Sequence, residues 1–233
     1  MQLAAILAVM LAVVGTSRER ELGGRWSWEA RHRELAAKIA ANGEETYDIV
    51  FIGDGLTELM ASSRQGNDGV FAEYFGKYRT FNLGLQGDRL ENIIWRLENG
   101  ALNGYKAKVF RIMAGSNNLP QKWPPAMIAE GVGRIVELIQ QKHPEAKVEI
   151  VAILPRADRR MSKGGMDRLQ AANLLIGRLA DGTNVAVVDI AQEFLTADGL
   201  IKRANYRDGL HLSPEGYRAL FAAEQETIGK LLE

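Results

Sequence analysis

The chain has 233 residues, 46% of them hydrophobic, which favours one domain with a sizeable core over two cramped ones. Lysine and arginine together number 29, as do aspartate and glutamate, so no net charge points to nucleic acid or an anionic membrane as a partner. The sequence has no cysteine, which excludes disulfides, a thiolate nucleophile and a cysteine-based zinc site, and its only histidines are His32, His143 and His211.

An unbroken apolar run, LAAILAVMLAVV, occupies residues 3–14. It has about the length of a signal-peptide core and is too short to span a bilayer comfortably. No lysine or arginine precedes it, so a packed amphiphilic helix is the alternative. We expect residues 1–20 to be a signal peptide or an N-terminal apolar segment and residues 21–233 to form one domain. The expected location is the periplasm or the medium, and otherwise the cytoplasm.

Short, β-branched apolar runs alternate with helical patterns along the rest of the chain. The runs predict buried strands at residues 47–53, 79–83, 108–113, 147–154 and 184–190. Helical spacing predicts helices at residues 26–41, 56–64, 88–99, 124–142, 165–180 and 214–232. This alternation predicts a three-layer α/β/α sandwich around a central five-stranded parallel sheet, of the flavodoxin-like kind.

For several polar and aromatic residues, a structural role is expected rather than a catalytic one. His32 and His143 lie in polar helical stretches and are expected to face solvent. Trp95 is expected in the core of its helix, and Trp123, before two prolines, is expected to anchor a loop. Residues 156–166 form a charged, glycine-containing loop, whose arginines at 156–160 are expected to be solvated rather than to bind an anion.

Turns of small and polar residues follow three of the predicted strands. GDGLT spans residues 53–57, GLQGD spans 84–88 and GSNN spans 115–118, while DGLHLS, at 208–213, precedes the last helix. Sites in parallel sheets form at the carboxyl ends of the strands. We therefore expect these four segments to meet at one edge of the sheet and to hold any functional site.

These segments lie within four longer blocks that resemble those of the SGNH (GDSL-type) hydrolase family. The blocks are DIVFIGDGLTE, FNLGLQGDRLENIIWRLENG, IMAGSNNL and RDGLHLSPEGY, in this order. The chain is most similar to the branch that contains the catalytic subunits of platelet-activating-factor acetylhydrolase. Four blocks in order are a specific signal, whereas any one of them alone is weak.

The resemblance implies a site for each catalytic role. Gly55 stands where the family has its nucleophilic serine. His211 would be the general base, and Asp208 would orient it, which is chemically reasonable because an aspartate three residues before a histidine can fold back onto the ring. The backbone N–H groups of Gly55 and Gly87 and the side chain of Asn117 would form the oxyanion hole. Asp54 and Asn118 are expected to support the loops, Asn118 alternatively to touch the ligand.

Glycine has no hydroxyl, so no acyl-enzyme can form at residue 55. Thr57 could substitute as nucleophile, but its hydroxyl is more readily expected to cap the following helix. A water activated by His211 is a second, slow alternative. The sequence therefore predicts an ester hydrolase for short acyl or acetyl groups that is inactive or strongly impaired as written.

Two alternatives of other classes remain. Gly55 either replaces the serine of an ester hydrolase or is native to a pseudoenzyme that binds acylated or acetylated ligands. The third interpretation is a partner-binding oligomeric protein, with a homodimer as the simplest form. The resemblance implies a mechanism without cofactor or metal, and the sequence does not distinguish a carbohydrate from a lipid as the alcohol part of the substrate.

Overall fold

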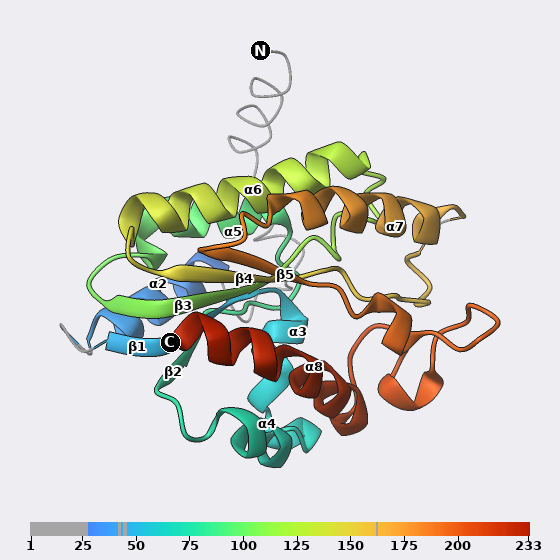
Figure 1. The fold of residues 1–233 in the computed structure, drawn as a ribbon, viewed down its shortest axis with the longest axis horizontal. Helices are drawn as coiled ribbons and strands as arrows, with labels where there is room; N and C mark the ends of the chain where they lie inside the picture. The colour runs from blue at the N-terminus through green and yellow to red at the C-terminus, as the bar shows by residue number, and fades with distance from the viewer. Residues whose placement is uncertain (1–27, 42, 44–45, 162) are drawn as a thin grey trace.

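The computed structural model describes residues 28–41, 43, 46–161 and 163–233 (Figure 1). The apolar segment predicted for residues 1–20 lies outside these ranges. No helix within them is both long and apolar enough to cross a membrane.

The centre of the fold is a sheet of five parallel strands in the order β2-β1-β3-β4-β5 (Figure 1). The strands are β1 (Thr46–Gly53), β2 (Thr80–Asn82), β3 (Lys106–Met113), β4 (Lys147–Val151) and β5 (Val185–Val188). Helices cover both faces, which explains why the strands consist of apolar runs rather than alternating patterns. The predicted three-layer α/β/α sandwich is confirmed.

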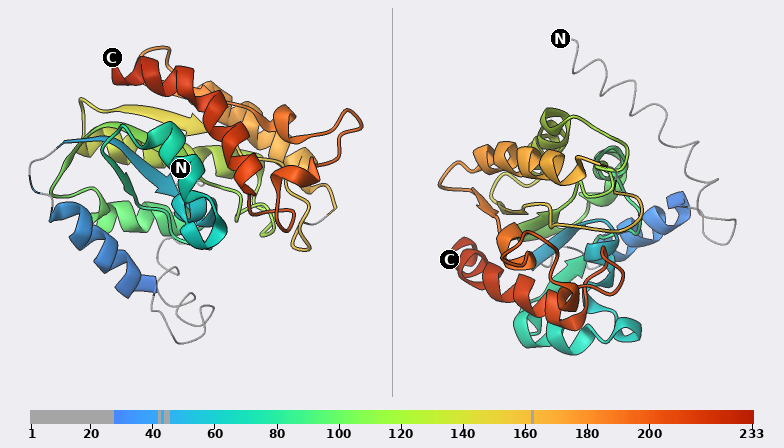
Figure 2. Two further views of the ribbon diagram at one scale, coloured as in Figure 1. Left: turned by 90° about the horizontal axis from the view of Figure 1, so that it is seen from below. Right: turned by 90° about the vertical axis from the view of Figure 1, so that its right-hand side faces the viewer.

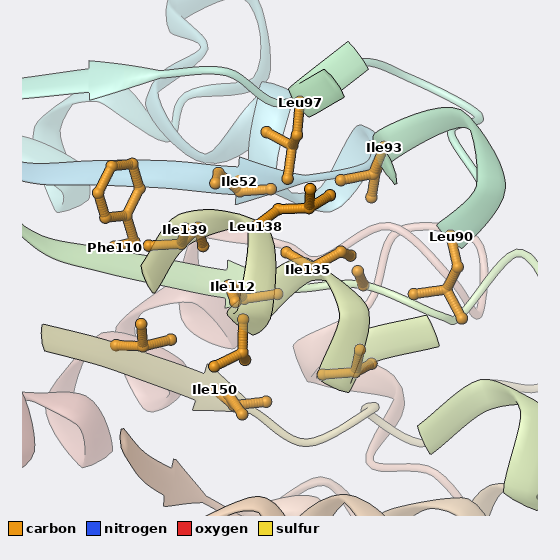
Figure 3. Packing of buried hydrophobic residues seen from close by; sticks show 14 of the residues in the cluster. Ile52, Leu90, Ile93, Leu97, Phe110, Ile112, Ile135, Leu138, Ile139 and Ile150 are labelled. Carbon is orange, nitrogen blue, oxygen red and sulfur yellow. The ribbon is translucent and has the colours of Figure 1, made fainter. Parts of the chain in front are cut away.

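The helices divide between the two faces of the sheet (Figures 1 and 2). One face packs against α2 (Trp28–Ala40), α5 (Leu90–Arg96), α6 (Pro125–Lys142) and α7 (Gly165–Ile176). Figure 3 shows this core, in which Ile52, Ile112 and Ile150 from three neighbouring strands meet Ile135 and Leu138 of α6. The other face packs against α3 (Gly55–Glu58), α4 (Asp68–Phe75) and α8 (Pro214–Leu232).

The main differences from the predicted elements are an earlier strand end, a shorter helix and one additional helix. The strand predicted to reach residue 154 ends at Val151, because the side-chain amide of Asn173 on α7 bonds both the N–H and the carbonyl of Ile153 at 2.9 Å. The helix predicted over 56–64 is only one turn long and continues as two short 3₁₀ turns. Helix α4 was not predicted.

Helix α8 is fixed to the sheet by buried polar contacts. Arg111 on β3 forms an ion pair with Glu224 on α8, and both side chains are fully buried. Glu149, beside Arg111 on β4, is also buried, and burial, with the nearby charge of Glu224, raises its pKa well above the usual range. Tyr217 donates a hydrogen bond of 2.6 Å to the carbonyl of Leu56. The Tyr217 bond holds the beginning of α8 next to α3, and the Arg111–Glu224 ion pair holds the middle of α8 against β3.

The prediction that His32 and His143 face solvent is wrong, since both are buried. Nε2 of His32 lies 2.9 Å from the carbonyl oxygen of Asn99, and Nε2 of His143 lies 3.1 Å from that of Leu102. Each ring thus donates to a carbonyl in the segment between α5 and β3. Burial lowers the pKa of both imidazoles.

The tryptophans agree only in part with their predictions. Trp123 is buried, as a loop anchor should be. Trp95, expected in the core, is half-buried and packs against Trp28, with 5.1 Å between the ring centroids. It is Trp28, on the N-terminal helix α2, that is fully buried.

Candidate active site

Gly55 begins helix α3 directly after β1, and Asp54 caps that helix. Oδ1 of Asp54 accepts a hydrogen bond of 2.9 Å from the N–H of Leu56. Thr57 does not supply the cap expected of it: its hydroxyl is buried against Gly53, where a Cβ would lie only 2.1 Å from Oγ1. Among the described residues that hydroxyl has no hydrogen-bond partner, and Thr57 does not line the cleft described below.

Asp208 and His211 form a closed turn before α8. Oδ1 of Asp208 accepts from the backbone N–H groups of Leu210 at 3.0 Å and His211 at 2.8 Å, while Oδ2 lies 2.7 Å from Nδ1 of His211. Partial burial alone would raise the pKa of Asp208, but the hydrogen bonds from the ring and backbone of His211 outweigh it and lower that pKa. With Nδ1 engaged, Nε2 is the ring nitrogen left for a ligand.

Asn117 lies in the loop after β3 and faces two other loops. Its Nδ2 donates to Oδ2 of Asp54 at 3.1 Å and to the carbonyl of Asp88 at 2.9 Å. Both amide hydrogens are therefore used within the protein, so a ligand oxygen must share or replace one of these bonds. Gly87, in the loop after β2, has a φ of +77°, a conformation that favours glycine.

Asp54 is buried beneath this loop cluster. Desolvation raises the pKa of its carboxyl to about 6, and the charge of Asp88 adds to the effect, while the hydrogen bond from Leu56 opposes it. The backbone group that Asp54 bonds belongs to helix α3, which it caps, and its contact with Asn117 joins the first and third of the four segments.

Asn118 does not line the cleft. It is fully buried, accepts a hydrogen bond of 3.0 Å from the N–H of Leu90 and donates one of 2.9 Å to Glu91. Of its two expected roles, the structure therefore shows loop support: Asn118 holds the beginning of α5 against the loop after β3.

Asp88 is a structural residue of the site that was missing from the sequence-based set. Its carboxylate accepts hydrogen bonds from the indole of Trp28 at 2.8 Å and from Arg96 at 2.7 Å, and its carbonyl holds Asn117. The available signal was its place directly after Gly87 at the same sheet edge. Through Asp88, helix α2 is connected to the loop that carries Gly87, one of the expected oxyanion donors.

An open cleft of about 950 Å³ joins the predicted residues. Gly55, Gly87, Asn117, Asp208 and His211 all line it, so the structure brings together segments that are up to 156 residues apart, counted from 55 to 211. The remaining lining is mainly polar or charged and comprises Asp54, Leu56, Gln86, Arg89, Pro120, Gln121, Asp158, Arg160 and Leu210. Within the described part of the chain, no group of three or more His, Asp or Glu side chains could hold a metal ion.

Arg156 corrects the expectation of a solvated arginine cluster. Its side chain is buried, donates to Asp158 at 2.6 Å and donates to the carbonyl of Ser116 at 2.7 Å. Arg156 thus ties the loop after β4 to the loop that carries Asn117. Arg160, by contrast, is exposed at the rim of the cleft, as predicted.

The backbone at Gly55 can accommodate a side chain. Its φ lies outside the left-handed region, and the atoms nearest to a Cβ built there belong to the side chain and Cα of Gln86, at 3.2 Å or more. A distance of 3.2 Å is tight but involves a flexible, exposed side chain. Glycine is therefore not required at residue 55 by the fold, in contrast to Gly53.

Comparison with known proteins identifies the family. The GDSL-like Lipase/Acylhydrolase family matches residues 51–219. The alpha2 subunit of platelet-activating factor acetylhydrolase IB from Rattus norvegicus is 29% identical over 217 residues, which cover 91% of this chain and 88% of that protein. The human alpha1 subunit is 28% identical over 213 residues, covering 91% and 87%. The chain belongs to the GDSL-like lipase/acylhydrolase family.

Solved structures show the same fold. A GDSL-like lipase from Bacteroides thetaiotaomicron superimposes with a TM-score of 0.72 at 22% identity, covering 86% of this chain and 98% of the other. A carbohydrate acetylesterase from Sinorhizobium meliloti superimposes with a TM-score of 0.62 at 21% identity, covering 81% and 100%. At this level of identity the similarity concerns the fold alone.

Proposed function

We propose that the cleft is the active site of an SGNH-type ester hydrolase in which Gly55 occupies the position of the nucleophilic serine. The observation that carries the proposal is the Asp208–His211 pair, with Nδ1 and Oδ2 2.7 Å apart, in the same cleft as Gly55, Gly87 and Asn117. As written, the chain is an inactive or strongly impaired hydrolase.

With serine at residue 55, the steps would follow the usual acyl-transfer chemistry. The hydroxyl oxygen attacks the ester carbonyl carbon while Nε2 of His211 takes the hydroxyl proton. The developing oxyanion accepts hydrogen bonds from the N–H groups of residues 55 and 87 and from Asn117. His211 then returns the proton to the leaving alcohol, and a water releases the acyl group by the same route.

Glycine at residue 55 removes the attacking oxygen and leaves the rest of this set in place. Loss of the nucleophile of such a triad typically lowers kcat by about 10⁶, which corresponds to a barrier increase of about 8 kcal/mol. A residual acceleration of roughly 10³–10⁴ over water can remain from the oxyanion hole and from binding. A water activated by His211 is the route we propose for any such residual activity.

For the substrate, we propose an ester of a short acyl group, with acetyl as the simplest case. The support is the open cleft and the names of two relatives, an acetylhydrolase subunit and a carbohydrate acetylesterase. The largely polar lining suits a hydrophilic alcohol part, and a panel of acetylated sugars and acetylated lipids would separate the two classes.

A second candidate function is supported by Gly55 itself. A cleft with an oxyanion hole and no nucleophile can bind an acylated ligand without cleaving it, so the chain would act as a binding module. The two candidates predict different effects of a hydroxyl at residue 55. In a hydrolase that lacks only its nucleophile, the hydroxyl restores activity. In a cleft specialised for binding, the hydroxyl has no catalytic effect.

The decisive experiment is Gly55→Ser, assayed with p-nitrophenyl acetate beside the unmodified chain. Turnover that rises by several orders of magnitude and is lost again in the Gly55→Ser/His211→Ala double variant supports the hydrolase. Gly229→Ser is the matched control, because a Cβ at Gly229 on α8 meets nothing within 4 Å. If the folded Gly55→Ser variant shows no more turnover than this control, the hydrolase proposal is contradicted and the binding module is favoured.

We also propose, from the apolar run at residues 3–14, that the protein is exported and that residues 21–233 form one domain. Cell fractionation and the intact mass of the mature protein test this. A cytoplasmic product that retains its N-terminus contradicts the export proposal.

A further inference from the structure

Gln86 lies directly over Gly55. It is the residue before Gly87 in the loop after β2, and it lines the cleft with an exposed side chain. The three heavy atoms nearest to a Cβ built on Gly55 all belong to Gln86: Cγ at 3.2 Å, Cα at 3.5 Å and Cβ at 3.6 Å. Among the described residues outside its own helix and its chain neighbours, Gln86 is the one nearest to this side of Gly55.

The backbone of Gln86 is held in this place by the helix that Gly55 begins. Its N–H donates a hydrogen bond of 2.7 Å to the carboxylate of Glu58, the last residue of α3. On its other side, Asp88 is tied to Trp28 and Arg96. The loop therefore cannot easily withdraw from α3, and any relief of a contact at residue 55 must come from the side chain of Gln86.

We infer that Gln86 is a specificity-determining residue that controls access to the reacting centre. Gly55 and Gln86 form one steric unit, in the sense that a side chain at residue 55 and the side chain of Gln86 compete for the same space. A side chain at residue 55 requires the methylene groups of Gln86 to shift by a few tenths of an ångström, since a Cβ–Cγ distance of 3.2 Å is shorter than ordinary van der Waals contact. With glycine present, the Gln86 side chain occupies part of the space beside the expected attack position.

The consequence for function concerns the approach of an ester. The carbonyl must reach both residue 55 and the N–H of Gly87, and Gln86 contacts the first and directly precedes the second. Its methylene groups reduce the room for the acyl group near this centre. Only the identity of the reacting centre rests on the proposed function; the steric contact does not.

The test introduces Gly55→Ser on three backgrounds: the unmodified chain, Gln86→Ala and Gln192→Ala. Gln86→Ala removes Cγ, the closest atom, and Gln192 is an exposed glutamine outside the cleft that serves as the matched control. Two quantities are measured: the rate at which a fluorophosphonate labels Ser at residue 55, followed by intact mass, and the change in Tm caused by Gly55→Ser.

We expect the labelling rate to be about tenfold higher on the Gln86→Ala background, the factor that relief of a modest overpacking contact supplies. The fall in Tm caused by Gly55→Ser should be smaller there than on the other two backgrounds. Equal, measurable labelling rates on all three backgrounds, or an equal fall in Tm, would overturn the inference. If no background is labelled, the proposed hydrolase function fails. The Tm comparison alone then shows whether residues 55 and 86 compete for the same space.

Discussion

Asn117 and Asp54 are joined by a hydrogen bond of 3.1 Å from Nδ2 to Oδ2, between loops that follow two neighbouring strands. The other amide hydrogen of Asn117 is bonded to the carbonyl of Asp88. The side chain expected to stabilise an oxyanion is thus held in the ligand-free site by a buried carboxyl. Because the pKa of Asp54 is raised to about 6, the strength of this hold depends on pH in the mildly acidic range.

The first prediction concerns stability and pH. Asp54 has a pKa of about 6 when folded against an ordinary value of 3.8, so the folded state binds its proton more tightly than the unfolded state. Its contribution to stability is full below about pH 4 and is lost as the pH rises to about 6, by roughly 3 kcal/mol in all. Urea unfolding of the unmodified chain and of Asp54→Asn at several pH values measures it. Parallel stability curves for the two proteins contradict the raised pKa.

The second prediction contrasts two adjacent asparagines on the Gly55→Ser background. Asn117→Ala should lower kcat by about 10²–10³, the usual effect of losing one oxyanion donor. Asn118→Ala should instead lower the free energy of unfolding by about 1–3 kcal/mol, because the buried N–H of Leu90 loses its acceptor. Kinetics and urea unfolding of both variants separate the two effects. A catalytic loss confined to Asn118→Ala would reverse the assignment.

The third prediction concerns Asp208, also on the Gly55→Ser background. Asp208→Asn keeps the size of the side chain but removes the charge that holds Nδ1 of His211, and it favours the wrong tautomer of the ring. A fall in kcat of roughly 10⁴ is expected, as in other triads of this kind. Esterase kinetics across the pH range measure it. Activity within a few-fold of the parent would mean that Asp208 does not orient the base.

The fourth prediction concerns the buried ion pair that fixes α8. Glu224→Ala leaves the guanidinium of Arg111 buried beside Glu149 without its ion-pair partner and should cost about 3–5 kcal/mol of unfolding free energy. Glu226→Ala, which removes an ion pair with Lys230 on the same helix, should change the unfolding free energy far less, because both charges of that pair are exposed to water. Urea unfolding of both variants makes the comparison. Equal losses would show that α8 is held mainly by its apolar contacts.

Much of the fold could be predicted because it is encoded locally. The apolar run at residues 47–53 and its four counterparts have a composition that is typical of strands in a sheet that is covered on both faces. Turn residues such as those at 53–55 mark where each strand ends, and the parallel topology places those ends at one edge. The grouping of Gly55, Gly87 and Asn117 in one cleft follows from these two facts, whereas His211 lies in the segment before α8 and not at the end of a strand.

The predictions that were wrong concern contacts between distant segments. His32 reads as a surface residue of a polar helix, yet it is buried because a carbonyl at residue 99 faces it. The sequence around Arg156 indicates a charged loop, yet its guanidinium is buried, where it donates a hydrogen bond to the carbonyl of Ser116. A polar residue becomes buried when a partner meets it, and the pattern around the residue in the chain does not contain that partner.

The sequence by itself determined the strands, the edge at which the site lies and the absence of a hydroxyl at residue 55, since each is a property of a few neighbouring residues. Only the tertiary structure decided that Asn117 is bonded to Asp54, 63 residues away, and that Gln86 covers Gly55. These contacts depend on the paths of whole loops between strands, and a change of a few tenths of an ångström in the position of a loop would alter them. Hydrogen bonds and steric overlap are sensitive to distances of that size, whereas the periodicity of a sequence is not.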